Sequence, residues 1–197
     1  MNLAFVTFFE LSAILKVQKV NTSYRTKMEK LEILIQRTKE RNTEAFREIF
    51  ESLEARIFAY ANSHVSKRED AMDITQDTFI DLWKGMIGFS YRSDEEFYGF
   101  VFRILKKKIA RFYKQKRNDV SIEEIEIDAG FTEEHEDYRH LLKQINMLSE
   151  KYQEVLRLRY WSGMKLSEVA EFLGIDEGTA KVRHFRALNE LRKKIKE

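Results

Sequence analysis

Apolar residues recur along most of the chain at steps of three and four, the spacing that places them on one face of an α-helix. The pattern is clearest in three runs: Phe46, Ile49, Phe50, Leu53, Ile57 and Tyr60; Ile74, Phe79, Leu82 and Trp83; and Phe97, Phe100, Val101, Ile104, Leu105 and Ile109. Thr43 and Ser93 are expected at helix starts, and Gly85 and Gly88 at a helix end and a loop. The first half is therefore predicted to form about four helices.

A helix, a tight turn and a second helix are predicted over residues 166–186. Gly174 stands where the chain must turn sharply, and Asp176 is a natural N-cap for the second helix. The inward face of that helix is assigned to Ala180, Ala187 and Leu191. This order is typical of a helix-turn-helix that reads the DNA major groove. An ordinary helical corner with a solvated basic face has the same spacing, but the clustered positive charge favours DNA.

Charged residues are segregated along the chain. Residues 97–118 contain eight basic and no acidic residues, residues 118–138 contain nine acids and no Lys or Arg, and residues 139–197 carry 13 Lys and Arg against 8 Asp and Glu. We expect an all-α protein of two small cationic helical domains, an N-terminal helical bundle over 28–117 and a helix-turn-helix domain over 137–197, joined by an acidic linker over 118–136. Residues 1–27 are treated as an N-terminal extension that need not be native, because Met28 opens an amphipathic stretch.

Composition excludes several classes of protein. The 197 residues include no proline, no cysteine and 7 glycines, which argues against turn-rich β folds, disulfide scaffolds and thiolate metal sites. The apolar stretch 3–15 is interrupted by Glu10, has no basic residue before it and is too short to span a bilayer. We therefore expect a cytoplasmic protein without stable membrane insertion.

Aspartates recur at steps of three and four residues in the region before Trp83. Asp70, Asp73, Asp77 and Asp81 share one helix face. Like charges at this spacing repel by about 0.2–0.5 kcal/mol per pair, so a metal ion or a basic protein surface is expected to balance them unless the face is merely solvated. A carboxylate metal site in a helical bundle uses a Glu-x-x-His pattern, which is absent, and the four histidines are scattered. A basic protein partner is favoured, with no metal, no other cofactor and no catalytic residue.

A segment rich in both cations and aromatic rings follows. Its basic residues, together with Phe102 and Tyr113, are expected to lie off the buried stripe, where they can neutralise phosphates and stack on bases. The preceding loop offers Tyr91 and Arg92, which could hold an extruded base. This composition predicts contact with nucleic acid.

These residues resemble the extracytoplasmic-function group of bacterial RNA polymerase sigma factors. The signature is Asp70-x-x-Asp73-x-x-Gln76-Asp77-x-Phe79-x-x-x-Trp83, joined by Gly178-Thr179-Ala180-Lys181-Val182-Arg183. The resemblance implies that a first set docks on the clamp coiled coil of the largest polymerase subunit: Asp70, Asp73, Gln76, Asp77, Phe79 and Trp83. A second set would engage the minus-10 promoter element: Tyr91, Arg92, Arg103, Lys106, Lys107, Arg111 and Lys114. A third would engage the minus-35 element: Thr179, Lys181, Arg183 and Arg186.

The resemblance also implies a protein without enzymatic activity and with an anti-sigma inhibitor. The family often has Asn and Asp where this chain has Lys107 and Arg111, which makes its minus-10 helix more generally cationic. Two other functions remain open from the residues. A helix-turn-helix regulator that acts without polymerase docking would explain only the C-terminal module. A metal-dependent nuclease built on the aspartate face would explain only the acidic run.

Overall fold

The computed structural model describes residues 31–119 and 134–196, and within these ranges all regular structure is helical, which confirms the all-α prediction. The first module consists of α2 (Leu31–Lys39), α3 (Thr43–Asn62), α4 (Arg68–Gly85), the short 3₁₀ helix η2 (Met86–Gly88) and α5 (Asp94–Asp119). The second module consists of α6 (Glu134–Asn146), α7 (Glu150–Leu156), the π-helical turn η3 (Arg157–Trp161), α8 (Leu166–Leu173) and α9 (Glu177–Lys196). The predicted N-terminal extension and most of the predicted acidic linker lie outside the described residues, so the domain limits stay predictions.

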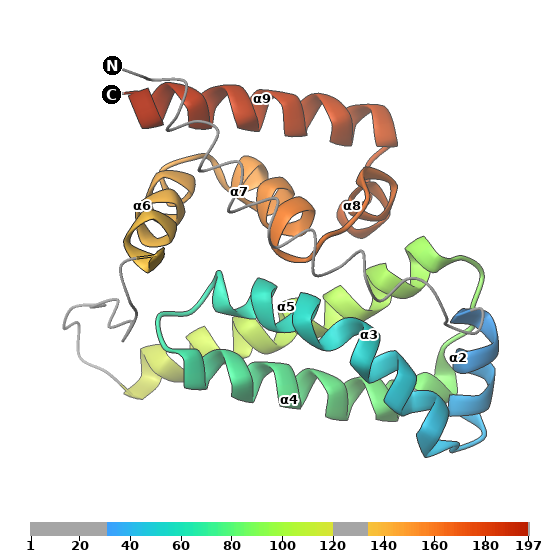
Figure 1. The fold of residues 1–197 in the computed structure, drawn as a ribbon. Helices are drawn as coiled ribbons and strands as arrows, with labels where there is room; N and C mark the ends of the chain where they lie inside the picture. The colour runs from blue at the N-terminus through green and yellow to red at the C-terminus, as the bar shows by residue number, and fades with distance from the viewer. Residues whose placement is uncertain (1–30, 120–133, 197) are drawn as a thin grey trace.

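Figure 1 shows the second module stacked on the first, with α8 next to α5. The core of the first module is continuous with residues of the second, because Val155, Leu158, Met164 and Val169 belong to the same buried cluster as the side chains of α3, α4 and α5. A second, smaller cluster joins α6, α7 and α9 around Leu156. The two modules are therefore packed together through a shared apolar core.

Side-chain caps fix where two helices of the first module begin. α3 begins at Thr43, as predicted, and Asn42 caps it, since its Oδ1 accepts a hydrogen bond of 2.9 Å from the Ala45 amide. The prediction for α5 is confirmed, because the Ser93 hydroxyl oxygen accepts from the Glu96 amide at 3.2 Å. Each cap satisfies an amide that the first helical turn leaves without a backbone partner.

The helix-turn-helix closes as the sequence predicts. Gly174 ends α8 in the left-handed conformation at φ 63°, which a residue without a Cβ adopts at no steric cost. Asp176 then caps α9, with its Oδ1 2.8 Å from the Thr179 amide nitrogen. The three residues assigned to the inward face are buried: Ala180, Ala187 and Leu191.

The prediction for Phe102 is wrong. Its side chain is fully buried and meets the Tyr60 ring edge-on, with 5.4 Å between the ring centroids. Because α5 is covered by α3, by α4 and by α8, its buried face is wider than a single apolar stripe indicates. Tyr113 stays 40% exposed, and its hydroxyl donates to the His64 carbonyl.

A pH dependence of stability is expected from His64. Its Nδ1 lies 2.8 Å from the Tyr60 carbonyl oxygen. Burial of the imidazole, together with the Arg157 cation, lowers the pKa of His64 from 6.5 to about 4. The unfolded chain binds this proton below pH 6.5, whereas the folded chain does so only near pH 4. The free energy of unfolding is therefore unaffected by this group well above pH 6.5, and it falls progressively as the pH drops from 6.5 towards 4.

Between pH 7.5 and pH 5 we expect the free energy of unfolding to fall by about 2 kcal/mol through this group. Urea denaturation of the native chain and of His64→Gln at both pH values measures it. The variant should lose clearly less stability on acidification than the native chain. Equal losses would show that His64 titrates alike in the folded and unfolded states.

Candidate functional site

A groove of about 840 Å³ runs between α3 and α4. Its apolar lining includes Phe46, Phe50, Phe58, Met72, Phe79, Ile80 and Trp83. Asp73 and Gln76 add polar groups to the same lining, and both are exposed. The groove is thus a mostly apolar, open surface whose lining also includes two carboxylates, Asp73 and Glu54, and two cations, Arg68 and Lys84.

The structure brings together four of the six residues predicted to dock on a protein partner: Asp73, Gln76, Phe79 and Trp83. Phe79 is only 5% exposed and forms the floor, with its ring 4.4 Å from that of Phe50. Trp83 is half-buried and its ring lies 4.9 Å from that of Phe46. Asp70 and Asp77 do not line the groove.

Among the groove residues that the sequence did not predict, two are exposed and apolar. Met72 and Ile80 are 54% and 42% exposed, although both are large and apolar. A helix face defined by Gln76 and Trp83 contains both positions, so helical spacing could have found them. They give the groove exposed apolar area that the acidic signature does not indicate.

The acidic face is balanced in part from within the chain. The Lys108 ammonium lies 2.7 Å from the nearer Asp81 oxygen and 3.5 Å from an oxygen of Asp77. The Lys108 side chain is only 12% exposed, so this cation is held between α4 and α5. A partner for these two carboxylates was expected to be a metal or another protein, and the structure instead supplies a lysine of the next helix.

Four of the predicted minus-10 cations form one exposed stripe along α5: Arg103, Lys107, Arg111 and Lys114. Their spacing of four, four and three keeps them on one helix face. Arg103 also lines a hollow of about 470 Å³ with Arg92, Glu96 and the stacked rings of Phe89 and Phe100, and the Arg92 guanidinium lies 3.7 Å from the Glu96 carboxylate. The stripe and the hollow thus place cations beside two aromatic rings, of which Phe89 is buried and Phe100 half-buried.

Two other predicted minus-10 residues point elsewhere. The Tyr91 hydroxyl donates to Asp94 at 2.7 Å, and burial raises the pKa of Tyr91 to about 12. The Lys106 ammonium lies 2.9 Å from Glu154 of α7 and 5.5 Å from the centre of the Phe172 ring of α8. Lys106 is therefore engaged by the second module in this arrangement.

The outer face of α9 carries the predicted minus-35 residues. Lys181 and Arg186 are exposed, whereas Arg183 is half-buried. The Thr179 hydroxyl donates to the Asp176 carboxylate, and these hydrogen bonds lower the pKa of Asp176. Val182 and Phe185, which the sequence did not predict as part of this surface, are 49% and 62% exposed between the cations. Their position opposite Ala180 and Ala187 already indicated that they point outward.

Other kinds of site find little support in the described part of the chain. No group of three or more histidine, aspartate and glutamate residues there is placed to hold a metal ion. Among the described helices, none combines the length and the apolar character needed to cross a bilayer.

Comparison with known proteins identifies the two modules. The family model for Sigma-70 region 2 matches residues 49–118, and that for Sigma-70, region 4 matches residues 138–191. The chain belongs to the sigma-70 family. The region 2 match contains α4 and nearly all of α5, and the region 4 match contains α8 and most of α9.

Relatives within the sigma-70 family support the assignment. The RNA polymerase sigma factor SigV of Bacillus subtilis is 29% identical over 69% of this chain and 82% of its own length. The sigma factor RpoE of Bartonella quintana, solved in complex with the anti-sigma factor NepR, is 29% identical with a TM-score of 0.57, over 77% of this chain and 96% of that one. CnrH, solved in complex with the cytosolic domain of CnrY, is 21% identical with a TM-score of 0.66, over 83% of this chain and 96% of that one, and shows the same fold.

Removal of the internal counter-ion tests how the acidic helix of this sigma-70 protein is held. Lys108→Met leaves Asp77 and Asp81 facing each other one helical turn apart, where they repel. We expect the free energy of unfolding to fall by about 1–2 kcal/mol in urea denaturation. The double variant Lys108→Met/Asp81→Asn should recover at least half of the loss. If the stability losses of Lys108→Met and of Asp81→Asn simply add in the double variant, the two side chains have no coupling energy.

Lys114→Met serves as the matched control for this cycle. Lys114 is an exposed cation on the same helix, so its replacement removes the same charge away from α4. We expect it to change stability by no more than about 0.5 kcal/mol.

Proposed function

We propose that this protein is a dissociable initiation subunit of bacterial RNA polymerase, which directs the core enzyme to specific promoters and helps to open the minus-10 element. That the chain is a sigma factor follows from the two family matches. The observation that carries the finer proposal is the separation of three surfaces: an apolar groove with a carboxylate, a cationic stripe with an aromatic hollow, and a helix-turn-helix.

The groove between α3 and α4 is assigned to core polymerase. A helical partner that inserts apolar side chains between the two helices would cover Met72, Ile80 and Trp83. A cation on that partner would meet Asp73, whose exposed carboxylate has no ion pair within the described residues. The family resemblance names this partner as the clamp coiled coil of the largest subunit, with Asp70, Gln76 and Asp77 nearby.

The stripe on α5 is assigned to the opened minus-10 strand. Four cations along one face can follow a phosphate backbone, and the half-buried Phe100 ring lines the hollow together with Arg92 and Arg103. An unpaired base can enter such a hollow, whereas a base within a duplex cannot. This difference favours binding of the separated strand and thus its opening.

The outer face of α9 is assigned to the minus-35 duplex. Arg186 and Lys181 can reach guanine edges or phosphates, while Val182 and Phe185 present apolar surface suited to thymine methyl groups. Two weakly binding modules gain avidity once polymerase fixes their spacing. The isolated protein is therefore expected to bind promoter DNA poorly.

We assign no enzymatic activity to the chain, because sigma-70 proteins are in general not enzymes. Its place of action is the cytoplasm, where polymerase meets the chromosome. CnrH was solved in complex with the cytosolic domain of CnrY, and RpoE was solved in complex with the anti-sigma factor NepR. We infer that an anti-sigma factor controls this chain as well.

Charge reversal at the groove tests the docking assignment. Asp73→Lys places a cation where the partner's cation would lie, while leaving the Lys108 ion pairs of α4 untouched. We expect association with purified core polymerase to weaken at least tenfold, about 1.4 kcal/mol or more. Fluorescence anisotropy of the labelled protein measures the affinity, and run-off transcription from candidate promoters should fall in parallel.

Glu40→Lys is the matched control, because it makes the same charge change at an exposed turn outside the groove. It should bind core polymerase like the native chain. Native affinity in Asp73→Lys would refute the groove as the docking site. Absence of any transcript with the native chain on all templates would instead refute the function itself.

The helix-turn-helix assignment is tested with holoenzyme and paired templates. Arg186→Ala should weaken binding to a promoter with an intact minus-35 element by about 1–3 kcal/mol and have little effect when that element is scrambled. Filter binding at several salt concentrations measures both. Lys193→Ala, an exposed cation further along α9, is the control and should lower affinity only slightly on both templates. Equal losses on both templates would mean that Arg186 contacts phosphates alone.

A further inference from the structure

A residue in an unfavourable backbone conformation stands at the corner between α2 and α3. Arg41 has φ 65°, and in the described part of the chain it is the one residue other than glycine with a positive φ. Its amide donates to the Thr38 carbonyl at 2.9 Å, and the Asn42 amide donates to the Arg37 carbonyl at 3.1 Å. These two hydrogen bonds close the end of α2 in the Schellman pattern, which requires the left-handed conformation.

The end of α8 has the same corner with glycine in the left-handed position. The amide of Gly174, at φ 63°, donates to the Glu171 carbonyl at 3.2 Å, and the Ile175 amide donates to the Ala170 carbonyl at 3.0 Å. Both hydrogen bonds join residues with the same sequence separations as at Arg41. Glycine adopts this conformation without steric cost, whereas a residue with a Cβ does not. The α2 corner therefore carries a strain that the α8 corner avoids, and such strain is typical of functional positions.

The Arg41 side chain lies over an aromatic ring of the groove. Its guanidinium carbon is 5.3 Å from the centre of the Trp83 ring. The Phe46 ring packs against the same indole, with 4.9 Å between the centroids and 63° between the planes. Arg41 is exposed, and within the described residues its side chain forms no ion pair and no hydrogen bond. The contact with Trp83 is thus what the Arg41 side chain provides.

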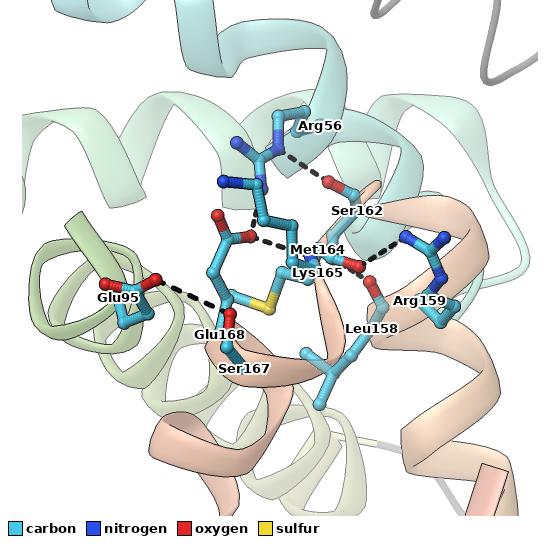
Figure 2. Close-up of polar contacts among 9 residues, drawn as sticks. All are labelled: Arg56, Glu95, Leu158, Arg159, Ser162, Met164, Lys165, Ser167 and Glu168. Carbon is cyan, nitrogen blue, oxygen red and sulfur yellow. Dashed lines mark hydrogen bonds and ion pairs between the residues drawn. The ribbon is translucent and has the colours of Figure 1, made fainter. Parts of the chain in front are cut away.

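Arg56 of α3 shows how differently an arginine can be held in this fold. Its Nε donates to the Ser162 carbonyl at 2.6 Å, and its guanidinium lies 3.4 Å from the Glu168 carboxylate (Figure 2). Arg56 therefore has oxygen partners and an ordinary helical backbone. Arg41 has a strained backbone and an aromatic partner instead.

A favourable interaction with the dipole of α2 does not account for Arg41. Cations stabilise the C-terminus of a helix, but Arg37 and Lys39 already place two of them in the last turn of α2. A glycine at position 41 would close the corner equally well and at lower cost. It would not supply a cation over the Trp83 ring, and that attraction limits the orientations that the ring can adopt.

We propose that Arg41 is a positioning residue for docking, which holds the Trp83 side chain in place so that the groove is preformed when its partner arrives. Trp83 is half-buried and lines the groove. An aromatic ring that is already fixed loses less conformational entropy when a partner covers it, and tryptophan is prominent among the residues that dominate interface energies. The inference rests on the proposed function, because it assumes that a protein partner binds in the groove.

Three replacements of Arg41 separate docking from stability. Arg41→Gly removes the cation and the strain, Arg41→Gln removes the cation alone, and Arg41→Lys keeps both. We expect Arg41→Gly and Arg41→Gln to weaken binding to purified core polymerase about three- to tenfold, and Arg41→Lys to retain most of the affinity, as measured by fluorescence anisotropy. In urea denaturation, Arg41→Gly should be at least as stable as the native chain and more stable than Arg41→Gln, because only glycine relieves the strain.

Arg47→Gln is the matched control. It removes the same charge from an exposed site of α3, where Arg47 pairs with Glu44 and Glu51 outside the groove. This variant should bind core polymerase like the native chain. If affinity follows stability across the Arg41 variants, Arg41 acts only through the fold and the proposal is wrong. Equal affinity of all the variants would overturn it as well.

The contact is also tested without polymerase. Labelling with 5-fluorotryptophan gives two fluorine NMR resonances, one from Trp83 and one from Trp161. The Trp83 resonance, assigned with Trp83→Phe, should shift in Arg41→Gly and stay near its native position in Arg41→Lys, while the Trp161 resonance should not move. An unchanged Trp83 resonance in Arg41→Gly would overturn the proposal. If the shift is observed but the native chain fails to bind core polymerase, the proposed function is refuted instead.

Discussion

The fold depends on the cations of α5, which form three groups: one pairs with α4, one pairs with α7, and the others face solvent. On one side of α5, Lys108 balances Asp77 and Asp81 and so ties α4 to α5. On another side, Lys106 reaches Glu154 and ties the first module to the second. The remaining cations face solvent as a stripe that a phosphate backbone can use. A helix with so many positive charges is compatible with a packed fold because carboxylates from two neighbouring helices neutralise those that face the protein.

The acidic helix is divided in a similar way. Asp81 is turned towards α5, whereas Asp73 lies along the groove with Gln76 and Ile80. A uniform acidic face would repel itself, but here part of the charge is neutralised within the chain and part is left for a partner. The division lets α4 take a fixed position and still offer a carboxylate beside exposed apolar side chains.

Local chemistry accounts for what the sequence predicts correctly. Gly174 and Asp176 define the turn because each acts on backbone groups within a few residues. Such local effects can be predicted from the neighbouring amino acids in the sequence. The burial of Phe102 and the engagement of Lys106 could not be read in that way. Both depend on which module covers which side of α5, and the contacts that decide it join residues as far apart as Arg56 and Glu168, 112 positions along the chain. Helical periodicity gives the faces of a helix but not the identity of its neighbours.

The same division of charges bears on the proposed DNA binding of a sigma-70 protein whose net charge is only +2. Its cations are concentrated on a few helices, and some of them face carboxylates of the same chain, as Lys106 faces Glu154 and Lys108 faces Asp81. Binding to DNA must then replace internal ion pairs as well as release counterions, which weakens the affinity of the free protein. In the proposed function, polymerase adds what each module lacks alone, because it fixes the spacing between the two surfaces assigned to DNA. Specificity would thus arise from the assembly, with each module alone contributing only a weak and salt-sensitive contact.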